Sequence, residues 1–152
     1  MKLSIPRIKQ PQVFYCILGL ALLLYGTAVR DGHNWGGDFS QYILHAQNLI
    51  NGLSYTDLGY VNKTYAQIGP RGYPPGYPLS IVPVLYLFGL NFIVLKLVVI
   101  LFLVFGLYVY YHYARFFLST TWALGCLAFL TFAPWMLKFS NNVLSDIPYM
   151  SF

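Results

Sequence analysis

Long runs of apolar residues with almost no charge among them limit most strongly how this chain can fold. Residues 92–111 form one such run, and Lys96 is the only charged residue in it. A helix needs about 20 mostly apolar residues to cross a bilayer, because each residue advances it by only about 1.5 Å. The chain is 58% hydrophobic and 9% charged, whereas soluble domains carry roughly 25% charged residues. The sequence therefore predicts an all-α polytopic membrane protein.

Three apolar runs have the length of a transmembrane helix, namely residues 13–29, 92–111 and 118–137. A fourth run, 79–90, has only about a dozen residues and contains Pro83, which favours a re-entrant half-span over a full crossing. The segment 30–78 between the first and the fourth run is rich in Gly, Tyr, Asn and Pro. We expect it to be one long outer loop.

The basic residues indicate how these spans are oriented. Lys2, Arg7 and Lys9 precede the first run, and such residues favour the cytoplasmic side. With 79–90 as a half-span, Arg115 also lies in the cytoplasm and the loops around positions 38 and 146 both face outside. A full crossing at 79–90 would place those two loops on opposite sides. The net charge of +5 is scattered and forms no patch, so nucleic acid is not an expected partner.

The outer loop itself contains a predicted helix. Its apolar residues recur at helical spacing along one face, at Tyr42, Ile43, Ala46, Leu49 and Ile50. The pattern predicts an amphipathic helix over 39–50 that lies along the membrane surface. Residues 69–78 follow later in the loop, and their prolines argue against regular helix there.

Acid chemistry depends on aspartate alone, because the chain has no Glu. Asp38 directly precedes the predicted helix, and Gln41 three residues later completes a capping-box pattern. Asp38 is therefore interpreted either as a helix cap or as a general base, and one carboxylate can do both. Asp146 likewise precedes Pro148 at a helix start, with the same two interpretations. Acids near lipid depth are costly to bury and tend to mark functional sites.

The remaining candidates are basic or aromatic. Arg71 lies in the proline-rich turn, where its guanidinium would hold either a substrate phosphate or a lipid headgroup. Most of the 14 tyrosines are interpreted as an interfacial aromatic belt. His33 and His45 lack the spacing of metal ligands, so no cofactor is predicted and a divalent metal is not indicated. Cys16 and Cys126 fall in apolar runs and are interpreted as packing residues.

Several short motifs occur in an order that is similar to one enzyme family. They are Gly37-Asp38 with Tyr42 and Ala46, the turn Pro74–Pro78, Leu87-Phe88-Gly89 with Asn91 and Lys96, and Leu144–Pro148. In this order they resemble the first part of the GT-C membrane glycosyltransferases. The likeness is closest to the branch near the protein O-mannosyltransferases and the lipid A aminoarabinose transferase, and it extends from the first span to the end of the chain, residues 1–152.

This resemblance implies an inverting transfer of a sugar from a polyprenyl-phosphate donor to a protein, lipid or glycan acceptor. It implies catalytic roles for Asp38 and Asp146, and substrate binding by Arg71, Tyr42, Tyr73 and Lys96. The implied location is a bacterial inner membrane, with the N-terminus in the cytoplasm and the site outside.

Two positions depart from the family pattern. Many relatives have a second acid directly after the first, where this chain has Phe39, and they carry a basic residue in place of Tyr73.

Other hypotheses remain beside the transferase. Family members are several hundred residues long, so we expect the chain to be an N-terminal part of an enzyme and inactive alone. The alternative is a non-catalytic membrane subunit or a transporter. Transport is disfavoured because the predicted spans carry a single charge, Lys96, and so offer no polar path across the bilayer.

Overall fold

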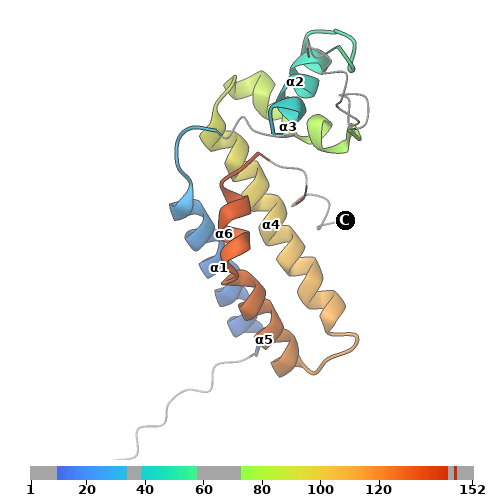
Figure 1. Ribbon diagram of the computed structural model, residues 1–152. Helices are drawn as coiled ribbons and strands as arrows, with labels where there is room; N and C mark the ends of the chain where they lie inside the picture. Colours follow the sequence, from blue (N-terminus) through green and yellow to red (C-terminus); the bar gives the residue numbers. More distant parts are fainter. Residues whose placement is uncertain (1–9, 34–38, 58–72, 144–145, 147–152) are drawn as a thin grey trace, which may run out of the picture.

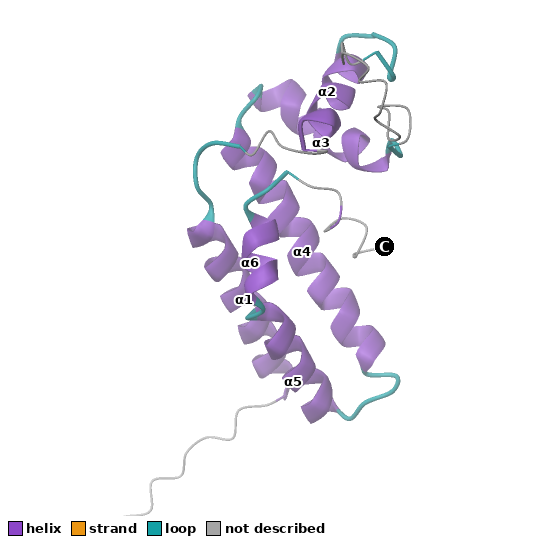
Figure 2. Cartoon of the chain, viewed as in Figure 1, coloured by secondary structure: helices purple, strands orange, loops and turns teal. Residues whose placement is uncertain are grey.

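The computed structural model of the chain describes residues 10–33, 39–57, 73–143 and Asp146. Within these ranges every regular element is a helix, which confirms the predicted all-α class (Figure 2). Helices α1 (Gln10–Ala28) and α4 (Phe92–Ala114) are long and apolar enough to cross a membrane. Both occupy runs that the sequence predicted as spans, and α4 extends three residues further than expected.

Three helical segments form a bundle. Helix α1 packs against α4 and against α5 (Thr120–Thr131) and α6 (Pro134–Ser140), and α4 packs against the same two short helices. In Figure 1, α1 and the α5–α6 segment run in one direction and α4 runs in the other. The buried side chains between them are almost all apolar, for example Phe14, Ala21, Leu95, Val99 and Leu127.

The predicted span over 118–137 consists of two helices rather than one. Helices α5 and α6 together are apolar enough to cross a membrane, but they meet at a bend of 55°. Ala133 at the break is extended and Pro134 begins α6. Proline has no N–H to donate and its ring clashes with the preceding turn, so a helix breaks there and a new one can begin with proline in its first turn.

The remaining two helices, α2 (Phe39–Ile50) and α3 (Gly76–Phe88), pack on each other. They lie at the end of the bundle where α4 begins (Figure 1). The prediction of a helix over 39–50 is confirmed at both ends. Its apolar residues Tyr42, Ile43 and Ala46 are buried, and the packing of α2 on α3 shows that this face meets protein, where the sequence predicted a membrane surface.

Helix α3 corrects the prediction for the proline-rich turn. It begins at Gly76, so Pro78, which was expected to exclude helix, is its third residue. Proline is tolerated there because the first N–H groups of a helix have no partner within it. The helix continues through Pro83 and ends at Phe88, before Gly89 (φ 63°). With 13 residues it is shorter than the two helices that are long enough to cross a membrane, and it contacts α2 and α4. The predicted half-span stays a prediction.

Candidate functional site

The ends of three bundle helices converge next to the α2–α3 layer. The backbone N–H of Arg30, just after α1, donates to the side-chain oxygen of Asn141 after α6 (3.1 Å). The ammonium of Lys96, in the second turn of α4, donates to the carbonyl oxygens of Arg30 and Gly32, each at 2.7 Å. These contacts join the segment that leads toward Asp38 to the segment that leads toward Asp146.

Lys96, which the resemblance implies binds substrate, lies in the second turn of α4 and is only 2% exposed. The described hydrogen-bond partners are two neutral carbonyl oxygens, while the carboxylate of Asp31 on the same loop accepts the N–H of Gly32 (2.8 Å). An ammonium has three N–H donors, so one of them is left for a further acceptor.

His33 lies beside this lysine. Its ring stacks on Phe92, the first residue of α4, with 4.9 Å between ring centroids and 5° between planes. Burial, followed by the positive charge of Lys96, lowers the pKa of His33 below its usual value. Both effects disfavour the protonated ring, so the imidazole is kept neutral next to the buried ammonium.

The two predicted substrate-binding tyrosines belong to one aromatic cluster in the α2–α3 layer. The buried ring of Tyr42 meets the rings of Tyr73 and Tyr77 edge to face, with centroids 5.2 and 5.3 Å apart. The hydroxyl of Tyr55 donates to the carbonyl of Tyr73 (3.2 Å). The structure therefore brings Tyr42 and Tyr73 together. Their predicted contact with substrate stays a prediction.

The other predicted site residues are not brought together by the described contacts. Asp38 and Arg71 lie outside the described residues. Asp146 is described and its side chain is exposed, which leaves it available to a substrate. The roles in catalysis and phosphate binding that were predicted for these three residues remain predictions.

Sequence reasoning missed a polar stripe on α2. Gln41, His45 and Asn48 are spaced by four and three residues and therefore share one helix face. All three are buried, and two of them hydrogen-bond residues 54–57, which fold back over the helix. The helical spacing was visible in the sequence, but polar residues at such spacing usually indicate a face that meets water.

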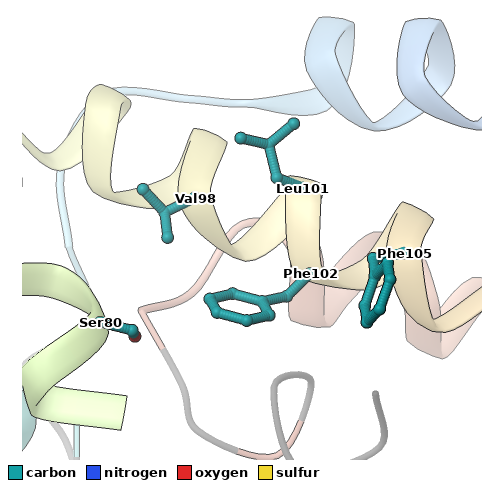
Figure 3. A pocket seen from close by; sticks show the side chains of 5 residues that line it. All are labelled: Ser80, Val98, Leu101, Phe102 and Phe105. Atoms are coloured by element: carbon teal, nitrogen blue, oxygen red, sulfur yellow. The ribbon is translucent and has the colours of Figure 1, made fainter. Parts of the chain in front are cut away.

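An apolar groove of about 350 Å³ lies between α3 and α4. Ser80 of α3 and Val98, Leu101, Phe102 and Phe105 of α4 line it (Figure 3). Its lining suits a hydrocarbon chain.

The described residues contain no group of three or more His, Cys, Asp or Glu side chains that could hold a metal ion. Comparison of the chain with protein-family models, with curated proteins and with solved structures finds no match in any of the three.

Proposed function

We propose that this chain belongs to a multi-pass membrane glycosyltransferase of the GT-C type. In this proposal the enzyme transfers a sugar from a polyprenyl-phosphate donor to an acceptor hydroxyl at the outer face of a bacterial inner membrane. The N-terminus is cytoplasmic, and α1, α4 and the bent α5–α6 segment are the spans. The acceptor is a protein, a lipid or another glycan.

One observation supports this proposal most directly. The loops that lead toward the two predicted catalytic acids meet at one end of an apolar helix bundle, beside the buried ammonium of Lys96. A buried charge is costly unless an opposite charge or further hydrogen bonds compensate it. The phosphate of a lipid donor would supply both, and the groove between α3 and α4 would receive its tail.

The proposed reaction is an inverting displacement at the anomeric carbon. Asp38 takes the proton of the acceptor hydroxyl as its oxygen attacks, and the bond to the lipid phosphate breaks on the opposite face. General-base assistance of this kind is worth roughly 10²- to 10⁴-fold. Lys96 and Arg71 stabilise the negative charge that develops on the departing phosphate. Asp146 orients the acceptor.

The test uses membranes from cells that express the protein from its complete gene. Radiolabelled polyprenyl-phosphate sugars are supplied one at a time, with mannose, glucose, N-acetylglucosamine or aminoarabinose as the sugar, and loss of label from the lipid is measured. We expect Asp38→Asn to slow the transfer roughly 10²- to 10⁴-fold. The control is Asp57→Asn, which changes an exposed acid in the same loop and should leave the rate unchanged. Transfer by Asp38→Asn at the wild-type rate would exclude Asp38 as the base, and no transfer of any sugar would contradict the proposed function.

A further inference from the structure

In the buried polar stripe of α2, some hydrogen-bonding groups are paired within the described part of the chain and others are not. At its C-terminal end, the side-chain amide of Asn48 donates to the carbonyls of Ser54 (3.0 Å) and Asp57 (2.6 Å). One turn earlier, Nδ1 of His45 lies 2.6 Å from the carbonyl oxygen of Tyr55, and the ring of Tyr55 stacks on the imidazole at 4.1 Å. These contacts hold residues 54–57 against the helix and fix the His45 ring.

The contact with Tyr55 also determines which nitrogen of His45 carries the proton. A carbonyl oxygen can only accept, so Nδ1 must be the donor. In the neutral ring Nε2 then has a lone pair and no hydrogen. His45 is fully buried, and Nε2 has no hydrogen-bond partner among the described residues. The ring therefore presents a buried acceptor for which the described part of the chain supplies no donor.

A second acceptor of the same kind lies one turn toward the N-terminus of α2. Gln41 is 5% exposed, and its side-chain oxygen Oε1 also lacks a partner in the described part of the chain. On the facing helix, the buried hydroxyl of Tyr77 is in the same situation. Leaving such a group unpaired destabilises the folded chain, and nearly all buried polar groups in native proteins are paired. Two unpaired acceptors on adjacent turns indicate a ligand with hydrogen-bond donors.

The charge around these atoms narrows the class of ligand. An amide oxygen and an unprotonated imidazole nitrogen are both neutral, so they match neutral donors such as hydroxyl groups. A cationic ligand would require a buried anion beside it, whereas the described carboxylates, on Asp31, Asp57 and Asp146, belong to exposed residues. Aromatic rings complete the surroundings, since the centroid of Tyr73 lies 6.4 Å from that of His45.

We propose that Gln41 Oε1 and His45 Nε2 form a binding site for two hydroxyl groups of a sugar. Gln41 and His45 lie one turn apart on α2 and share a face of that helix. The choice of a sugar rests on the proposed transferase function, while the two unpaired acceptors do not depend on it. Because both residues are buried, the proposal requires a local opening of the α2–α3 layer through which the ligand enters.

Two substitutions separate this site from a merely structural role. Gln41→Met removes the unpaired oxygen and keeps the length of the side chain. His45→Asn keeps a donor at the position of Nδ1, which can still reach the Tyr55 carbonyl, and removes the acceptor at Nε2. The complementary variant His45→Gln keeps a polar atom near Nε2. Asn48→Leu is the control for folding, since both hydrogen bonds of Asn48 are internal.

The experiment measures binding of free monosaccharides to the full chain by saturation-transfer NMR. The protein is held in phospholipid nanodiscs, so that no sugar-based detergent competes. The probes are mannose, glucose, galactose and N-acetylglucosamine at millimolar concentration. We expect at least one to bind, with affinity at least tenfold weaker in Gln41→Met and His45→Asn and partly kept in His45→Gln. Gln41→Met should also unfold at a higher temperature without ligand, because it removes an unpaired buried acceptor.

Two results would overturn the inference. One is that no monosaccharide binds the wild-type chain. The other is that binding is unchanged in both Gln41→Met and His45→Asn, which would leave an internal water as the partner of these atoms. Sugar binding that depends on both residues, without transfer from any polyprenyl-phosphate sugar, would support the site and contradict the transferase. Sugar transfer that depends on Asp38, without any monosaccharide binding, would support the transferase and contradict the site.

Discussion

The bundle of α1, α4, α5 and α6 and the α2–α3 layer bury polar groups in different ways. In the bundle, the hydroxyl of Tyr25 donates to the carbonyl of Thr131 (2.8 Å), and the hydroxyl of Thr131 donates to the carbonyl of Leu127 (2.9 Å). Both of these buried hydroxyls are paired. In the α2–α3 layer, the described polar atoms of Gln41, His45 and Tyr77 are buried without a hydrogen bond.

This difference follows from what each region has to do. A helix surrounded by lipid has no water to pair its polar groups, so each one must find a partner inside the protein. The bend before Pro134 ends α5 at Thr131, whose carbonyl lies beyond the last regular turn, and the Tyr25 hydroxyl supplies the missing donor. Unpaired atoms in the other region are tolerated where a ligand can supply the partner. If the proposed sugar site exists, the contrast separates a part built for stability from a part built for binding.

The largest expected effect concerns Lys96, which joins the start of α4 to the loop after α1. Lys96→Met removes both hydrogen bonds to the carbonyls of Arg30 and Gly32, so the free energy of unfolding should fall by about 2 to 3 kcal/mol. The measurement is unfolding in mixed micelles by titration with sodium dodecyl sulfate. The control is Lys138→Met, because Lys138 is exposed and contacts the ring of Trp135 (4.7 Å). If both variants lost the same free energy of unfolding, the buried hydrogen bonds of Lys96 would contribute no more to stability than an exposed lysine does.

A smaller effect is expected within the bundle itself. Tyr25→Phe removes the hydroxyl that pairs the Thr131 carbonyl at the bend. Hydrogen bonds between membrane helices are worth about 0.6 to 1.7 kcal/mol, so the variant should lose roughly 1 kcal/mol in the same titration. Tyr15→Phe, on the same helix at an exposed position, serves as the control and should unfold like the wild type. If Tyr25→Phe lowered the free energy of unfolding as much as Lys96→Met does, the expected order of the two effects would be wrong.

The smallest effect is a dependence on pH near His33. Its pKa is lowered in the folded chain from an unfolded value near 6.5, by burial and by Lys96. Below about pH 6.5 the unfolded chain therefore binds a proton that the folded chain resists, and stability falls as the pH falls. Thermal unfolding from pH 8 to pH 5 measures this, and His33→Gln should show a weaker dependence. An identical dependence in wild type and variant would mean that other groups cause it.

Much of the fold could be predicted from residue patterns. The amphipathic spacing of 39–50 and the uninterrupted apolar run that became α4 both lead directly to helices. The bend at Pro134 was missed because an apolar run containing a proline can cross a membrane straight or broken. Its direction depends on partners such as Tyr25, which lies 106 residues from Thr131. Pro78 was expected to exclude helix because proline breaks a helix interior. It lies in the first turn of α3, where proline is compatible with helix.

The candidate site was less predictable, for a related physical reason. A hydropathy scale predicts that Lys96, His45 and Asn48 are exposed to water. In the structure they are buried under short loops, and the carbonyl oxygens of these loops accept their hydrogen bonds. Whether a polar residue meets water or a backbone carbonyl is decided by how a loop folds back. The periodicity of a single helix contains no information about that.

The bend between α5 and α6 has a consequence for biosynthesis. A helix of 12 residues is about 18 Å long and one of 7 residues about 10 Å, and neither length covers a hydrocarbon core of about 30 Å. If the chain is inserted by the translocation machinery, neither piece can be recognised as a stop signal by itself. We expect both to enter together with α4 as a hairpin, since the tight turn over 115–119 holds α5 beside the far more apolar α4. The most hydrophobic of the described helices would then be the insertion partner of two helices that are each too short to span the bilayer.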